Sequence, residues 1–246
     1  MSRFYYHPEI NQSTILALSH EESLHLKTNR IQPETEILLS DGLGSLYSGI
    51  FKGFVSQLAQ VEVVGKVKKE DNAYQLWIWQ PLLKNWSRLE WLIEKLVEVG
   101  VSGIGIFYCE RCVRERISST KEERWRKIII EAAKQSGRIR FPILKVITNW
   151  FDFLTHCRSN NLNTIIGDFS SSESISDYLK EQSSFSLQII VGPEGDFSEG
   201  EKEQLHSLPK VCFLRFSNQI LRSETAALYA SIVSIASLES KHENCY

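Results

Sequence analysis

Two short segments of this 246-residue chain combine glycine, proline and charged side chains in a way that a purely structural turn does not require. The first, 191–198, has the sequence VGPEGDFS, and the second, 220–227, has the sequence ILRSETAA. Each has the pattern of a strand followed by a loop and the start of a helix. Two such turns close together in an α/β chain predict a binding crevice at the carboxyl ends of neighbouring strands.

The glycines of the first segment suit a backbone that passes close to a ligand. Gly192 and Gly195 flank a Pro-Glu pair. Glycine permits close approach and positive φ, and proline stiffens the loop. Ser198, with Glu201 three residues later, forms a capping-box pattern that predicts a helix just after the loop. A tight strand-to-helix turn without a ligand explains this loop equally well when it is taken alone.

The second segment predicts another helix start. Ser223 can cap the helix, and Glu224 then falls in the first turn, where a carboxylate suits the helix dipole. Arg222 stands just before this helix, where packing alone does not explain an arginine. Alanines at 226, 227 and 230 give the helix a face of small residues that allows close approach to another element.

Elements that alternate between strand and helix position these turns. The sequence predicts strands at 74–80, 103–108, 143–148, 164–168, 187–191 and 211–216. Helices are expected around 89–97 with a stop at Gly100, at 121–136, at 175–180, and from about 198 and 224. Strands that alternate with helices imply crossover connections and a mainly parallel sheet covered by helices.

The first seventy residues have a different pattern. Short strands are expected at 3–7, 14–18, 36–40, 45–51 and 57–67, with turn signals between them and almost no helical periodicity. Such a series predicts a small β-barrel or sandwich. The polar run 68–72 is a plausible linker, so we expect two domains, 1–70 and 73–246.

The charge of the chain is unevenly distributed. The net charge of −2 argues against a generally basic nucleic-acid binder. The window 109–145 nevertheless holds eleven Lys and Arg residues and five Glu residues. A basic patch on an acidic body fits selective contact with a phosphate backbone. A solvated helix face with charge pairs one turn apart explains the same window equally well.

Several common chemistries are excluded by their missing motifs. The chain has no GxGxxG loop, no GxxxxGK[ST], no GxSxG and no HExxH. It has no apolar run long enough to span a bilayer, and its five cysteines show no framework spacing, so we expect a reduced, cytoplasmic compartment. Cys109 and Cys112 could be half of a zinc site or a redox pair, but nothing nearby completes a tetrahedral set.

Taken together, the two segments resemble the last two motifs of the RsmE family of 16S ribosomal RNA methyltransferases, which belong to the SPOUT class. Residues 190–195 read IVGPEG and residues 220–226 read ILRSETA. Further matches lie upstream at 98–101 (EVGV), 110–112 (ERC), 132–138 (AAKQSGR) and 3–5 (RFY). The resemblance therefore spans essentially the whole chain. It also gives Cys112 a place in a motif that has no metal role.

The resemblance implies both a fold and a reaction. The fold is a SPOUT-type, mainly parallel α/β sheet with a deep trefoil knot, preceded by a small PUA-like, RNA-binding β-barrel. The reaction is methyl transfer from S-adenosylmethionine to N3 of a uridine in 16S rRNA of the small ribosomal subunit, with S-adenosylhomocysteine as the second product. No metal or membrane contact is expected, and the protein is expected to be a cytoplasmic homodimer.

The resemblance also implies a set of site residues. Cofactor binding is expected at Gly167, Gly192, Glu194, Gly195, Leu214, Ser217, Asn218, Ile220, Leu221 and Thr225. We expect Arg138 or Arg222 to stabilise negative charge on a uracil carbonyl oxygen, which favours loss of the N3 proton. Glu224 is a weaker candidate for the proton acceptor, because a carboxylate near a helix N-terminus is a poor base. RNA contacts are expected from Arg3, Arg30, Arg111 and Arg140.

The chain departs from the family pattern at a few positions. Asp196 stands where the family usually has glycine, Ser217 and Asn218 replace Leu-Gly, and Gln219 replaces a common basic residue. Because asparagine tolerates left-handed geometry, Asn218 is expected to hold the backbone shape of a glycine. These departures motivate an alternative, a catalytically inactive RNA-binding or ribosome-assembly factor on the same fold. A third possibility is methyl transfer to a different nucleotide.

Overall fold

The computed structural model describes residues 4–10, 14–70, 74–112, 116–160, 162–182 and 186–243. The chain forms two compact units. The first contains Met1–Asp71 and Ile129–Phe141, and the second contains Asn72–Ile128 and Pro142–Tyr246. The first unit therefore includes a segment from far along the sequence as well as the first seventy residues.

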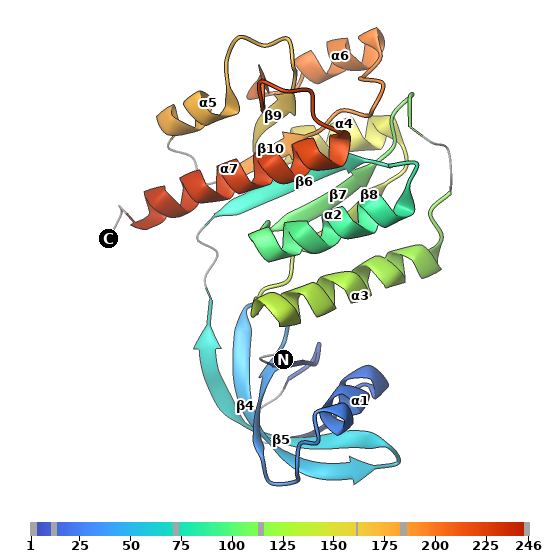
Figure 1. The fold of residues 1–246 in the computed structure, drawn as a ribbon, viewed down its shortest axis with the longest axis vertical. Coiled ribbons are helices and arrows are strands. Elements are labelled where there is room, and N and C mark those ends of the chain that lie inside the picture. Colours follow the sequence, from blue (N-terminus) through green and yellow to red (C-terminus); the bar gives the residue numbers. More distant parts are fainter. Residues whose placement is uncertain are drawn as a thin grey trace. The chain divides into compact units, whose positions relative to one another are not determined.

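The first unit is built on a five-stranded sheet with the order β1-β3-β4-β5-β2. Its strands are β1 (Tyr5–Tyr6), β2 (Ile15–Ala17), β3 (Glu36–Ser40), β4 (Ser45–Val55) and β5 (Leu58–Lys69). β1 pairs in parallel with β3, and the other pairings are antiparallel. The register between β4 and β5 shifts at three places. Such bulges bend a strand pair, and Figure 1 shows the curvature of this one.

A helix that the sequence pattern did not predict, α1 (His20–Thr28), also belongs to the first unit. Ser19 Oγ accepts a hydrogen bond from Glu22 N at 3.2 Å and so caps the helix. The Glu22 carboxylate is buried, and its Oε1 forms an ion pair with Lys134 Nζ at 2.7 Å. Burial raises the pKa of Glu22, and the Lys134 ammonium opposes that rise. The first seventy residues therefore contain one helix beside the expected strands, and its weak periodicity hid it in the sequence.

The second unit is built on a six-stranded sheet in which every pairing is parallel, so the prediction of a mainly parallel α/β sheet is confirmed. The strands are β6 (Gln75–Pro81), β7 (Gly103–Phe107), β8 (Ile143–Ile147), β9 (Asn163–Gly167), β10 (Ser186–Ile190) and β11 (Val211–Leu214). Their order is β11-β9-β10-β6-β7-β8. The loops that follow β9, β10 and β11 therefore leave neighbouring strands at one edge of the sheet.

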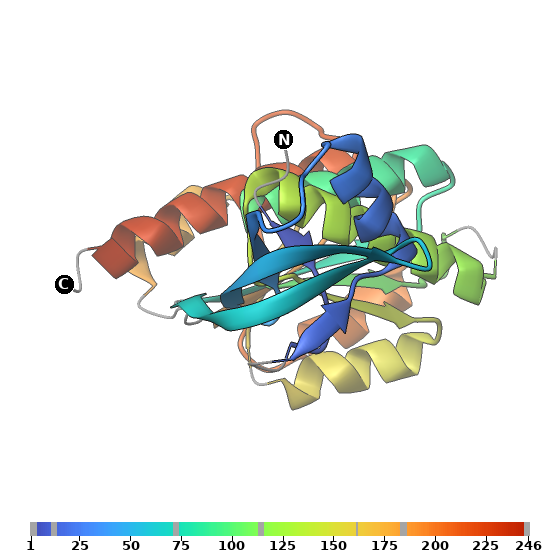
Figure 2. The ribbon, with the colours of Figure 1, turned by 90° about the horizontal axis from the view of Figure 1, so that it is seen from below.

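Helices cover both faces of this sheet, as Figures 1 and 2 show. They are α2 (Trp86–Val99), α4 (Trp150–Ser159), α5 (Ile175–Glu181), α6 (Glu199–His206) and α7 (Ser223–Glu243), and α3 (Ser119–Ser136) runs from this unit into the first. α2 and α7 pack together on one face. α4 and α6 share a buried apolar cluster on the other face. α4 was not predicted from the sequence.

Side chains of β6 alternate between the two faces. Trp79 packs edge-on against Phe153 of α4, with ring centroids 5.2 Å apart, whereas Gln80 bonds to Ser223 at the start of α7. A Cβ at Gly105 of β7 would lie 2.1 Å from the Trp79 ring, so only glycine leaves room for this indole. No helix in the described part of the chain is long and apolar enough to cross a membrane.

Candidate active site

Three loops, those after β9, β10 and β11, meet at the carboxyl edge of the parallel sheet. With the first turn of α7, Arg88 of α2, and Lys202 and His206 of α6, they line a cavity of about 930 Å³. Both motifs take part, because one forms the loop after β10 and the other joins the loop after β11 to α7. The predicted crevice is therefore present.

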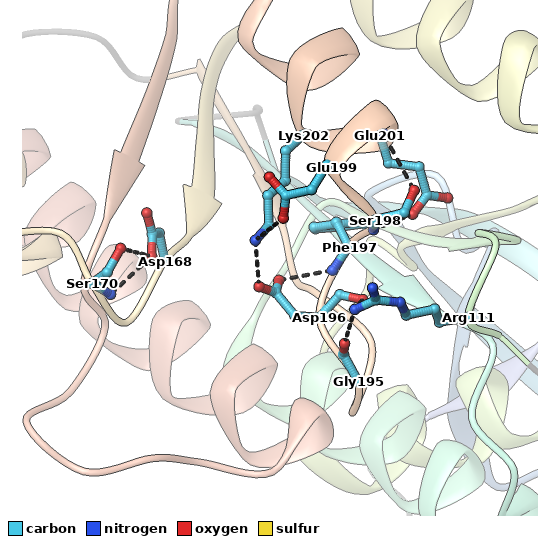
Figure 3. A network of polar contacts seen from close by, with 10 residues as sticks. All are labelled: Arg111, Asp168, Ser170, Gly195, Asp196, Phe197, Ser198, Glu199, Glu201 and Lys202. Atoms are coloured by element: carbon cyan, nitrogen blue, oxygen red, sulfur yellow. Dashed lines mark hydrogen bonds and ion pairs between the residues drawn. The ribbon is translucent and has the colours of Figure 1, made fainter.

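The loop after β10 turns tightly around Asp196, as Figure 3 shows. Asp196 N donates to Pro193 O at 3.0 Å, and the φ of Asp196 is 60°, in the left-handed region. Asp196 Oδ1 accepts from Phe197 N at 2.8 Å, and Oδ2 pairs with Lys202 Nζ at 2.9 Å. Aspartate tolerates this backbone conformation better than most residues, although glycine adopts it most freely.

α6 begins directly after this loop, as the sequence predicts. Ser198 Oγ accepts from Glu201 N at 3.4 Å, and Ser198 N donates to Glu201 Oε2 at 2.9 Å. These two bonds confirm the predicted capping box. Phe197, just before the cap, is buried with its ring 6.4 Å from that of Phe107, which fixes the end of the loop in the core.

A chain of buried hydrogen bonds links the two motifs. Gln80 Nε2, at the end of β6, donates to Ser223 Oγ at 2.8 Å. Ser223 Oγ in turn donates to Gly192 O at 2.7 Å. Gln80 is fully buried and Ser223 nearly so. α7 begins at Ser223 itself, and the hydroxyl that the sequence predicts as a helix cap instead fixes the first turn of α7 against the loop after β10.

The end of β9 lies close to the loop after β11. A Cβ at Gly167 would lie 2.8 Å from Phe216 Cε2, so glycine at this position permits the approach of the aromatic ring. The next residue, Asp168, accepts from Ser170 N at 2.8 Å and from Ser170 Oγ at 2.7 Å, both at Oδ1 (Figure 3). No other partner of the Asp168 carboxylate is found among the residues that the structure describes. Asp168 and Ser170 both line the cavity.

Arg88 stands between two carboxylates at the cavity. Its Nη1 atom is 3.5 Å from Glu224 Oε1 and 3.8 Å from Glu194 Oε1. Glu224 is buried, with 7% of its side chain exposed, and its Oε2 has no hydrogen-bond partner within the described part of the chain. The α2 arginine therefore connects the loop after β10 with the start of α7 by charge.

The structure brings many of the predicted cofactor and catalytic residues to the cavity. Those that line it are Gly167, Gly192, Glu194, Ser217, Ile220, Leu221 and Arg222. Others lie in the same strand ends, loops and helix start without lining it: Gly195, Leu214, Asn218, Thr225 and Glu224. Asn218 is not among the described residues with positive φ, so the expectation of a glycine-like backbone there was wrong. Asp196 adopts that backbone instead.

None of the remaining predicted arginines is among the described residues that line this cavity. Arg30, Arg138 and Arg140 belong to the first unit, and Arg3 lies outside the described residues. Arg140 Nη2 donates to Glu70 O at 2.8 Å within the first unit. Arg111 lies in the second unit, where its Nη1 donates to Gly195 O. Arg111 therefore contacts the backbone of the loop after β10.

Sequence reasoning missed several residues that line the cavity: Arg88, Asp168, Phe169, Ser170, Lys202, His206 and Phe213. The usable signal for Asp168 was its place directly after a parallel strand, where ligands bind in such sheets. Lys202 and His206 are one helical turn apart, so they face the same side once α6 is placed. Arg88 gave no local signal, because its partners are more than a hundred residues away in the sequence.

Cys109 and Cys112 lie in the turn after β7 as free thiols with their Sγ atoms 2.6 Å apart. The hydrogen bond from Cys109 lowers the pKa of the Cys112 thiol. The described residues contain no group of three or more His, Cys, Asp or Glu side chains that could hold a metal ion. Within that portion of the chain, the further ligands of a tetrahedral zinc site are missing.

Comparison with known proteins gives consistent matches. Residues 70–235 match the family described as an RNA methyltransferase domain. The chain is 32% identical over 183 residues to Ribosomal RNA small subunit methyltransferase E 2 of Borreliella burgdorferi, and the match covers 70% of each chain. It is 27% identical over 240 residues to the Rickettsia conorii Ribosomal RNA small subunit methyltransferase E, with 93% of each covered. The crystal structure of a Neisseria gonorrhoeae enzyme of that name, bound to S-adenosyl methionine, has a TM-score of 0.81 at 24% identity and 98% coverage of both chains.

Proposed function

Because the chain belongs to the RsmE family of RNA methyltransferases, we propose that it transfers the methyl group of S-adenosylmethionine to N3 of a uridine in 16S ribosomal RNA of the small subunit. The observation that carries the proposal is the cavity, in which both family motifs meet at the ends of three neighbouring parallel strands. The names of the relatives support the small ribosomal subunit as substrate. The ligand of the Neisseria structure supports the cofactor.

The cavity fits this cofactor in size and in chemistry. Its volume lies within the range of about 300–1,000 Å³ that is typical of small-molecule sites. Ile220 is 82% exposed and Phe169 is 54% exposed, so both offer apolar surface to an adenine ring. We expect the backbone at Gly192 and Ser217 to hold the base edges, and the Asp168 carboxylate to accept from ribose hydroxyls. Of the other predicted cofactor residues, Gly167, Glu194 and Leu221 line the same cavity, and Gly195, Leu214, Asn218 and Thr225 belong to the elements that form it.

The bound cofactor supplies a methyl group on a positively charged sulfur, ready for in-line transfer. The protein must then favour loss of the uracil N3 proton. Arg222 lines the cavity and is placed to stabilise negative charge on a uracil carbonyl oxygen. Arg138 remains a candidate for the same role. Glu224 forms an ion pair with Arg88, so we propose that Glu224 orients this arginine and does not remove the N3 proton.

The remaining features of the proposal follow the family. The SPOUT domain, residues 73–246, would thread its last strands as a deep knot, and residues 1–70 would act as a PUA-like RNA-binding barrel that presents Arg3 and Arg30. We propose a cytoplasmic homodimer. Trp91 of α2 and Tyr229 and Ile232 of α7 are 43%, 39% and 49% exposed, and apolar side chains of this kind suit a partner subunit. Sedimentation velocity at micromolar concentration tests the dimer.

A methylation assay tests the function. Purified protein and labelled S-adenosylmethionine are offered small subunits that lack the modification, with naked RNA as a comparison. We expect 3-methyluridine on the subunit, identified by mass spectrometry of nucleosides, and loss of turnover in Arg222→Ala with cofactor binding retained. Label on another nucleoside would correct the target. RNA binding without label transfer would support the inactive ribosome-assembly factor and refute the proposal.

A further inference from the structure

Arg111 lies in a turn that follows β7, outside the three loops that line the cavity. Cys112 N donates to Cys109 O at 3.1 Å and closes the turn. Arg111 Nη1 donates to Gly195 O at 2.5 Å and lies 3.4 Å from Asp196 O (Figure 3). The guanidinium therefore binds two successive carbonyl oxygens of the loop after β10. Asp196 itself lines the cavity.

The base of this turn is fixed independently of Arg111. Glu110 N donates to Glu201 Oε1 at 2.7 Å, while Glu201 Oε2 accepts from Ser198 N at 2.9 Å. Glu201 is only 6% exposed. One buried carboxylate thus caps α6 and holds the neighbouring turn, and bonds from backbone N–H groups to a carboxylate are among the stronger ones. Arg111 consequently extends from a fixed support.

The loop is also held from α6. Lys202 Nζ pairs with Asp196 Oδ2 at 2.9 Å, whereas Arg111 binds the backbone carbonyls. Gly195 carries no side chain to pack against its surroundings, so contacts to its carbonyl fix the peptide on that side. The positive φ of Asp196 raises the cost of this loop conformation, and the two cations favour it.

We propose that Arg111 is a positioning residue that sets the shape of the cofactor loop, and that it is not an RNA contact. The inference depends on the proposed function, because it assumes that the cavity takes S-adenosylmethionine. The inference separates Arg111 in function from the other basic residues of the window 109–145. Arg111 acts on cofactor affinity, and the RNA affinity of the chain comes from other residues.

The test uses Arg111→Ala and Arg111→Lys in the full chain, with Arg124→Ala as a matched control. Arg124 is an exposed arginine of α3 whose Nε donates to Glu90 Oε1 of α2 at 2.7 Å. Titration calorimetry with S-adenosylmethionine measures the Kd, and fluorescence anisotropy with a 16S rRNA fragment measures RNA affinity. We expect the cofactor Kd to rise about fivefold in Arg111→Ala, because an exposed, charge-assisted bond to a carbonyl is lost. Arg111→Lys should recover some of the affinity.

Kinetics separates positioning from general damage. Arg111→Ala should raise the KM for the cofactor and leave RNA affinity close to that of the unaltered protein, with kcat and the unfolding midpoint close to those of Arg124→Ala. An unchanged cofactor Kd with weakened RNA binding in both Arg111 variants would overturn the inference while the proposed function stands. A raised Kd in a protein that methylates nothing would support the inference and refute the function. Absence of cofactor binding in the unaltered protein would refute both.

Discussion

Ser223→Ala removes one hydroxyl that connects three elements of the site. Ser223 Oγ accepts from Gln80 Nε2 at 2.8 Å and donates to Gly192 O at 2.7 Å, and it is almost completely buried. The substitution deletes both bonds without adding atoms. The loop after β10 then loses its hydrogen bond to the start of α7, so we expect weaker cofactor binding together with lower stability.

The magnitude follows from what each partner retains. Gln80 Nε2 keeps its bond to Pro81 O at 3.2 Å, and Gly192 lines the cavity, where water can reach its carbonyl. Neither partner is therefore left fully unsatisfied. Two lost bonds at about 0.5–1.5 kcal/mol each, less a few tenths for the better helix propensity of alanine, give about 0.5–2.5 kcal/mol of destabilisation.

The assay is urea unfolding followed by tryptophan fluorescence. All six tryptophans belong to the second unit, so this signal reports the unit that contains Ser223. Ser231→Ala in the same helix is the control, because Ser231 is buried and, among the described residues, its Oγ bonds only to Ala227 O one turn earlier. We expect the control to stay within about 0.5 kcal/mol of the unaltered protein. A Ser223→Ala protein as stable as this control would refute the reasoning.

Three further predictions use the same protein. Gly167→Ala should lower the free energy of unfolding by about 1–3 kcal/mol, because the added methyl group overpacks against Phe216. Adding Phe216→Leu should recover some of that loss in the same unfolding assay. An unchanged stability of Gly167→Ala would contradict the prediction. Burial lowers the pKa of His156 in the folded protein, so the unfolded chain binds this proton at a higher pH. The free energy of unfolding should therefore fall as the pH drops below about 7. The difference between the unfolding midpoints at pH 7.5 and 5.5 should be smaller in His156→Gln than in the unaltered protein. Oxidised glutathione should convert the Cys109 and Cys112 thiols to a disulfide, with release of two molecules of reduced glutathione. Mass spectrometry should show the loss of two hydrogen atoms from the protein, and Cys112→Ser should abolish this loss.

The sequence predicted those features of the fold that depend on local patterns. Gly100 ends α2 with a φ of 108°, and Ser198 and Glu201 form the capping box, because both signals act within one helical turn. The parallel sheet followed from the alternation of strand and helix. α1 was missed because its apolar spacing is weak, although Ser19 and Glu22 carried the spacing of a capping box.

The polar architecture of the site could not be predicted in the same way. The bond from Gln80 to Ser223 joins residues 143 positions apart, and the bond from Arg111 to Gly195 joins residues 84 positions apart. Such pairs exist only after the sheet has brought its strand ends together. An arginine in a basic window carries no local sign of whether it binds RNA or a carbonyl. The motifs therefore located the cavity, and the tertiary fold determined which side chains hold it.

Asp196 shows how this distinction bears on activity. Its departure from the family glycine motivated the alternative of an inactive protein, and the left-handed backbone found there costs a residue with a side chain about 1–2 kcal/mol. The side chain that creates the cost also offsets it, since Oδ1 accepts from Phe197 N and Oδ2 pairs with Lys202. Lys202 is itself one-third exposed, so its ion pair contributes only modestly. The side-chain contacts of Asp196 therefore offset part of the cost of its left-handed backbone. The presence of this aspartate alone is not an argument for an inactive protein.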